Sequence, residues 1–64
     1  MTIILNGTAI ETGPCSLADL LAAQGFSGRV ATAVNEGFVP AALRAGHMLN
    51  DGDRVEVVAP MQGG

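Results

Sequence analysis

The sequence predicts an α+β fold in which a mixed sheet of four to five strands packs on one main helix, in the order ββαββ. Three observations predict it. An Asn-Gly pair joins two apolar runs at the start, one capped amphipathic helix follows, and the first and last predicted strands are apolar on both faces. Strands of that last kind belong in the middle of a sheet, where both faces are covered.

The first 12 residues predict a β-hairpin, because Asn6-Gly7 joins two apolar-rich runs. This pair tolerates the positive φ angles of a type I′ turn better than others do. A two-residue loop also fixes the register, so that alternate residues of each run share a face. We therefore expect Ile3, Leu5 and Ile10 on one face of the sheet, and Ile4 and Ala9 on the other.

Residues 15–26 predict a helix with both ends marked. Ser16 is the expected N-cap, and Asp19 three residues later completes a variant of the capping box. Gly25 is the expected left-handed stop, after which Phe26 can fold back on the helix. One narrow apolar stripe means one buried side, so the helix should lie across a flat surface. The stripe consists of Leu17, Leu20, Leu21 and Gln24.

The second half of the chain predicts further strands. Residues 30–34 predict a strand, residues 35–37 a turn, and Phe38-Val39 a short run that ends at Pro40. Residues 41–49 are ambiguous between a single helical turn and a loop, because Gly46 interrupts any longer helix.

Residues 50–53 predict a turn and residues 54–60 the last strand. A right-handed crossover through the helix would make the first and last strands parallel neighbours at the centre of the sheet. This arrangement is the β-grasp, or ubiquitin-like, fold.

The composition indicates one small folded domain and excludes several functions. Of 64 residues, 48% are hydrophobic and 14% charged, which excludes disorder. With one cysteine and one histidine, neither an intrachain disulfide nor a Cys/His metal site can form, so we expect no metal and a reducing, cytoplasmic location. A net charge of −3 with three scattered arginines offers no basic patch to nucleic acid or anionic membranes. No apolar run is long enough for a signal peptide or a membrane span.

The strand pattern stops at Pro60, and the chain ends on Gly63-Gly64. We expect residues 1–60 to form the domain and residues 61–64 to project as a flexible tail. Five extended residues from Pro60 reach roughly 16–18 Å, which would place the terminus inside the active site of a partner. Without side chains at the last two positions, a narrow channel can close around bare backbone. A carboxylate is a poor electrophile until it becomes an acyl-adenylate, so the tail predicts activation of its own C-terminus.

With these motifs the sequence resembles the ThiS family of thiamine-biosynthesis sulfur carriers over nearly its whole length. The shared features are the β-grasp order, the Asn6-Gly7 hairpin, VNEGFVP at 34–40, NDGDRVEVV at 50–58 and a terminal QGG at 62–64. Family members commonly carry a basic residue directly after the proline equivalent to Pro40. In this sequence Ala41 follows, and Arg44 is the nearest cation.

The resemblance implies a mechanism with three partners. A ThiF-like adenylating enzyme would consume ATP to convert Gly64 to an acyl-adenylate, and sulfur from a cysteine desulfurase relay would replace the adenylate to give a thiocarboxylate. A ThiG-like thiazole synthase would take that sulfur for the thiazole ring of thiamine. Gly63 would keep the approach unhindered, and Met61 and Gln62 would line the entry. The protein would be a carrier and cosubstrate, not an enzyme, and would bind no cofactor itself.

Two other functions stay open. A MoaD-like carrier for molybdopterin synthesis uses the same tail chemistry, although its members are usually longer. A ubiquitin-like interaction module would bind a partner through its sheet without modifying its tail. An enzyme acting alone is the least supported class, because the sequence has no nucleophile beside a base, no phosphate loop and no lysine.

Several residues have both a structural and a functional interpretation. Ile4, Phe38 and Val58 are either covered by loops of the protein or exposed as an apolar patch where a partner docks. We expect Cys15 to pack near the helix N-terminus rather than relay sulfur, and His47 to be a solvated loop residue rather than a catalytic one. The acidic residues Glu36, Asp51 and Asp53 are expected in turns and on the surface.

Overall fold

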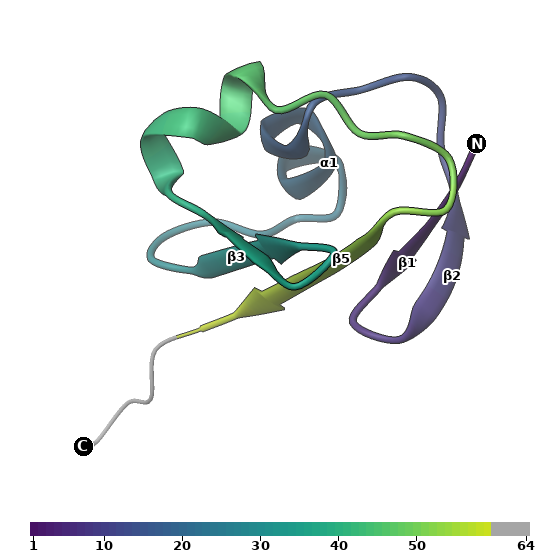
Figure 1. The fold of residues 1–64 in the computed structure, drawn as a ribbon. Helices are drawn as coiled ribbons and strands as arrows, with labels where there is room; N and C mark the ends of the chain where they lie inside the picture. Colours follow the sequence, from purple (N-terminus) through teal and green to yellow (C-terminus); the bar gives the residue numbers. More distant parts are fainter. Residues whose placement is uncertain (60–64) are drawn as a thin grey trace.

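The computed structural model describes residues 1–59, and in it a five-stranded mixed sheet carries one α-helix on one face (Figure 1). The strand order is β2-β1-β5-β3-β4. The short run Phe38-Val39 belongs to a separate strand, so the sheet has five strands, the larger of the two predicted numbers. The elements are β1 (Thr2–Leu5), β2 (Thr8–Glu11), α1 (Leu17–Ala23), β3 (Ala31–Val34), β4 (Gly37–Val39), the 3₁₀ helix η1 (Ala41–Gly46) and β5 (Arg54–Val58).

The first and last strands are parallel neighbours, as predicted. Ile4 is paired with Arg54 and Leu5 with Val55. On its other side β5 pairs antiparallel with β3, from Val34 opposite Val55 to Ala31 opposite Val58. The last strand in the chain, β5, is therefore the middle strand of the sheet, and it is hydrogen-bonded to β1 on one side and to β3 on the other.

The first hairpin has the predicted register, with Leu5 opposite Thr8 and Ile3 opposite Ile10. Asn6 and Gly7 both have positive φ angles, 48° and 84°, which are typical of a type I′ turn. Ile3 and Leu5 are buried and Ile10 is half-buried. The predicted inner face of the hairpin therefore does face the core.

The second hairpin contains the same kind of turn. Because Val34 pairs with Gly37, the loop consists of Asn35 and Glu36 alone. Their φ angles are 49° and 71°. The turn was predicted at this place, but a glutamate in left-handed backbone was not, since a side chain with a Cβ is disfavoured there.

The caps of α1 form as the sequence indicates. The Asp19 backbone N–H donates to Ser16 Oγ at 3.0 Å, and the Ser16 backbone N–H donates to Asp19 Oδ2 at 3.5 Å. At the other end the Phe26 N–H donates to the Leu21 carbonyl at 2.9 Å, and Gly25 has a φ of 82°, which is a Schellman ending. The buried stripe is one residue shorter than predicted, because Gln24 is exposed. Its members are Leu17, Leu20 and Leu21.

The ambiguous segment after Pro40 is the 3₁₀ helix η1, and it is tied to the sheet by Arg44. The Arg44 guanidinium donates to the Thr32 hydroxyl at 2.9 Å and to the Val30 carbonyl. Thr32, only 1% exposed, donates in turn to the Val39 carbonyl at 2.7 Å. These bonds satisfy a buried hydroxyl and join η1, β3 and β4.

The described part of the chain contains neither a membrane-spanning helix nor a cluster of metal-binding side chains. No helix within residues 1–59 is long and apolar enough to cross a membrane. The same residues contain no group of three or more histidine, cysteine, aspartate or glutamate side chains that could bind a metal ion.

Glu36→Gly is expected to stabilise the protein by about 0.5–1 kcal/mol. Left-handed backbone costs a residue with a Cβ about 1–2 kcal/mol, which exceeds the extra chain entropy that glycine loses, roughly 0.5–1 kcal/mol. The ion pair of Glu36 with Arg54 is 3.7 Å long and exposed, so its loss removes little. Urea denaturation measures the difference. Gly7→Ala is the opposite change at a φ of 84°, so it should lower the urea concentration at the unfolding midpoint. If Glu36→Gly is less stable than the wild type, the proposed backbone strain at Glu36 is contradicted.

Candidate functional site

The candidate site is the face of the sheet that α1 does not cover (Figure 1). Side chains alternate between the two faces along a strand. Because Val55 and Val57 point into the core, their neighbours in β5 point the other way. The residues on this open face are Thr2 and Ile4 from β1, Ala9 and Glu11 from β2, Ala31 and Ala33 from β3, Phe38 from β4, and Arg54, Glu56 and Val58 from β5.

Two large apolar side chains are well exposed on this face. Phe38 is 71% and Val58 63% exposed. They are linked through β3, because Phe38 pairs with Ala33 and Val58 with Ala31. The two small alanines between them leave a flat apolar surface at the end of the sheet where the chain leaves β5. We call these four residues, Ala31, Ala33, Phe38 and Val58, the apolar patch.

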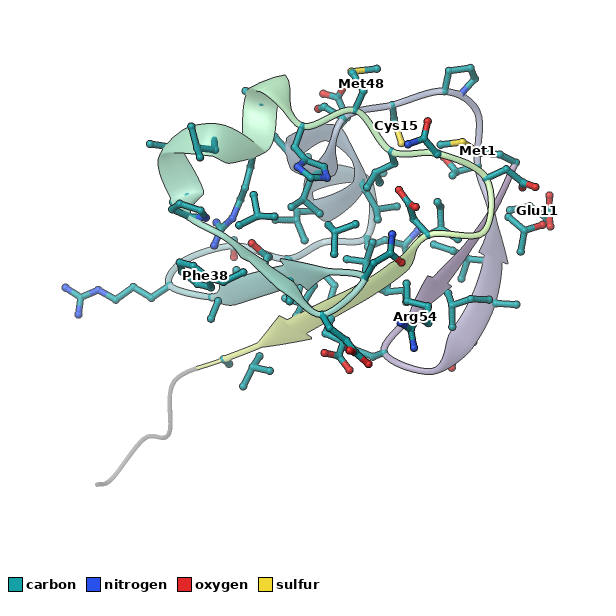
Figure 2. The ribbon with its side chains drawn as sticks, in the orientation of Figure 1. Met1, Glu11, Cys15, Phe38, Met48 and Arg54 are labelled. Atoms are coloured by element: carbon teal, nitrogen blue, oxygen red, sulfur yellow. The ribbon has the colours of Figure 1, made fainter. Side chains whose placement is uncertain are left out.

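Ile4 lies on the same face but apart from the apolar patch. It is paired with Arg54, at the start of β5, and it is half-buried. Figure 2 shows Arg54 near the β1–β2 hairpin and Phe38 toward the end from which the chain leaves. The charged side chains of Arg54 and Glu56 therefore separate Ile4 from the other two predicted docking residues.

A groove adjoins the apolar patch at the root of the predicted tail. It has a volume of about 270 Å³ and is lined by Arg29, Val30, Ala31, Val58 and Ala59. The groove lies where β3 begins and β5 ends, because Ala31 is paired with Val58, and Gly28, three residues before β3, has a φ of 76°. Its lining is mostly apolar, with one exposed cation, Arg29, at the rim.

The cation nearest Pro40 in sequence is not available to a partner. Arg44 is half-buried and its guanidinium donates inward to Thr32 and Val30. Arg54 is exposed but lies 3.7 Å from the carboxylate of Glu36. Arg29, which lines the groove, therefore differs from the other two arginines: its side chain forms no hydrogen bond or ion pair with another described residue.

The other candidates have structural roles. Cys15 is a half-buried free thiol that packs against the core, as expected. His47 is half-buried rather than fully solvated, and its carbonyl accepts the Leu17 N–H at 2.8 Å. Asp53 is buried and accepts from Asn35 Nδ2 at 2.9 Å and from the Asn50 N–H at 2.8 Å, so it stabilises its turn. None of them reaches the open face.

The predicted tail residues lie outside the described residues. Met61, Gln62, Gly63 and Gly64 therefore stay predictions. Sequence reasoning missed the groove, because it depends on where β3 begins relative to the end of β5. The one signal that could have indicated it was Gly28, a residue suited to a bend just before the strand.

Comparisons with known proteins agree with this architecture. A family model described as the ThiS family matches residues 3–64. Among solved structures, the chain is similar to the thiamine biosynthesis protein ThiS from Geobacter metallireducens, with 23% sequence identity, 100% of each chain covered and a TM-score of 0.85. That similarity establishes the fold and confirms the β-grasp prediction. No curated protein shows a significant match to the chain.

Val57→Asp and Val58→Asp form a matched pair that tests which face of β5 is open. Val57 is 7% exposed, so an aspartate there buries a carboxylate and should destabilise the protein by about 4 kcal/mol or more. Val58 is 63% exposed, so the same change should cost no more than about 1 kcal/mol. Circular dichroism with urea denaturation compares them. Equal losses would mean that the open face is covered in solution.

Proposed function

Because the chain belongs to the ThiS family, we propose that it carries sulfur on its C-terminal carboxylate for the thiazole ring of thiamine. The observation that supports this most is that the family match runs to Gly64 and so includes the terminal QGG. The tail follows directly from β5, the middle strand of the sheet. The apolar patch and the groove adjoin the residue where the described chain ends.

The proposed chemistry takes place in the active sites of partners. In a ThiF-like adenylating enzyme the Gly64 carboxylate attacks the α-phosphate of ATP, pyrophosphate leaves, and an acyl-adenylate forms. The outer sulfur of a persulfide on a cysteine desulfurase relay attacks the acyl carbon and displaces AMP, which gives an acyl disulfide. A thiol then cleaves the S–S bond, which leaves a thiocarboxylate on Gly64 and a disulfide between the thiol and the relay cysteine. A ThiG-like thiazole synthase then accepts the sulfur. Gly63 leaves room for a narrow channel, and Met61 and Gln62 line its entry.

In this proposal the protein contributes recognition and reach, and its partners contribute catalysis. The apolar patch supplies the area that a partner covers, and its exposed Phe38 supplies an aromatic anchor. The groove at Val58 and Ala59 can accept an apolar side chain of the partner, and Arg29 at its rim favours a neighbouring carboxylate. Ile4 would contact the partner only if the interface extends past Arg54 and Glu56.

Intact mass spectrometry should detect the thiocarboxylate directly. After incubation with ATP, a ThiF-like enzyme, a cysteine desulfurase and cysteine, the mass should increase by one oxygen-to-sulfur exchange. The variant lacking Gly64 should show no such increase, because it has lost the reacting carboxylate. It should still fold, since the deletion lies beyond the sheet. An unchanged mass of the full chain, with an enzyme proven on another carrier, would favour the interaction module instead.

The acceptor pathway is a separate question that the same product can answer. The purified thiocarboxylate is offered either to thiazole synthase with its other substrates or to a molybdopterin synthase large subunit. Sulfur transfer in the first reaction alone is the expected outcome. Transfer in the second alone would replace the thiamine assignment with the MoaD-like one.

Aspartate substitutions in the apolar patch should weaken docking to the adenylating enzyme. Phe38→Asp and Val58→Asp each place a charge where the partner excludes water, and each should raise the KM for the carrier roughly tenfold or more. Leu43→Asp is the matched control, because Leu43 is 60% exposed on η1, on the helix side of the sheet (Figure 1). If all three variants raise KM equally, the open face is not the docking surface.

A further inference from the structure

The two type I′ turns of the sheet share a feature that the turn type does not require. Each has an asparagine at its first loop position, Asn6 with a φ of 48° and Asn35 with a φ of 49°. In both cases the side-chain amide forms two hydrogen bonds, Asn6 to Val57 within β5 and Asn35 to Asp53 and Arg54 where β5 begins. The two turns lie on opposite sides of the middle strand.

Asn6 binds the peptide groups of Val57 near the end of β5. The Val57 N–H donates to Asn6 Oδ1 at 2.8 Å, and Asn6 Nδ2 donates to the Val57 carbonyl at 3.2 Å. The backbone ladder between β1 and β5 ends one step earlier, where the Asn6 N–H donates to the Val55 carbonyl at 2.9 Å. The side-chain amide thus takes the place of a β1 peptide after the chain has turned toward β2.

Asn35 binds the beginning of the same strand. The Arg54 N–H donates to Asn35 Oδ1 at 2.9 Å, and Asn35 Nδ2 donates to Asp53 Oδ1 at 2.9 Å. Asn35 therefore binds β5 at its start, far from the C-terminal end that Asn6 binds. The two residues have nearly the same φ angle and the same number of side-chain hydrogen bonds, so each is a control for the other.

We infer that Asn6 is a positioning residue for the C-terminal tail, an inference that rests on the carrier function proposed above. On the β1 side of β5, its amide is the last group that binds the strand. On the other side the ladder ends with Ala31 opposite Val58. Without Asn6, no described group would bind Val57 on the β1 side, so the end of β5 would be held by β3 alone and would fray. The tail would then leave from a variable point relative to the groove.

The consequence for a partner reaction is specific. The adenylating enzyme must bind Val58 and admit the tail at the same time, so a frayed strand end lowers the fraction of the carrier that is ready to dock. Once the terminus is inside the channel, the enzyme itself positions the carboxylate. Loss of the Asn6 side chain should therefore raise KM and leave kcat nearly unchanged.

Asn6→Gly and Asn35→Gly are the variants that test this inference. Glycine retains the positive φ of both turns and removes only the side-chain bonds. In Asn6→Gly the Val57 amide should exchange its hydrogen roughly tenfold faster, as expected from the loss of about one net hydrogen bond, while the Arg54 amide is unchanged. KM should rise by less than the factor by which exchange accelerates, with kcat within about twofold of the wild type. Asn35→Gly should accelerate exchange at Arg54 and leave KM unchanged.

A purely structural role would give a different result. If both variants raise KM in proportion to their loss of stability in urea, or if Val57 exchange does not change in Asn6→Gly, the inference is wrong. Asn6→Asp decides the case in which Asn6→Gly unfolds, because it retains the acceptor for the Val57 N–H but places a carboxylate oxygen against the Val57 carbonyl, where the donor was. Its KM should exceed that of the wild type, and a KM equal to wild type would overturn the inference. If the wild type is not adenylated at all, the proposed function fails, and the exchange experiment still tests whether Asn6 fixes the strand end.

Discussion

The parallel pairing of β1 with β5 is the interaction on which the rest of this structure depends. It brings the two ends of the sequence together at the centre of the sheet, so the chain cannot complete its core until its last strand is in place. Contacts between such distant segments are entropically expensive and must be offset by burial. Ile3 and Val55, both fully buried, supply that burial on the two strands. The tail consequently begins at one of the best supported strands of the fold.

Much of this fold could be predicted because its signals are local. The register of the first hairpin follows from Asn6-Gly7, and the limits of α1 follow from Ser16 and Gly25. The conformation of Glu36 could not be predicted, because the residue type does not favour it and the loop length is set by strand pairing. Val34 is paired with Gly37, and a two-residue type I′ turn needs a positive φ at both of its positions.

The open face was predictable in part. Strand alternation placed Ile4, Phe38 and Val58 on one side, and the structure agrees on their orientation. Their separation depends on the pairing of β5 with both neighbours, which puts Arg54 and Glu56 between Ile4 and the others. Similarly, the sequence shows only that Arg44 is the cation nearest Pro40. Its inward bonds to Thr32 and Val30 arise only when η1 packs beside β3.

The position of the apolar patch at the exit of β5 limits how a carrier of this kind can move between enzymes. Under the proposed function, a partner that covers Val58 and Ala59 would lie at the point where the described chain ends. Two enzymes that both dock there would compete for the same few side chains. Sulfur would then be passed on by release and rebinding, which favours fast dissociation over tight binding at each step. A small patch of one aromatic and three aliphatic side chains is well suited to such short-lived complexes.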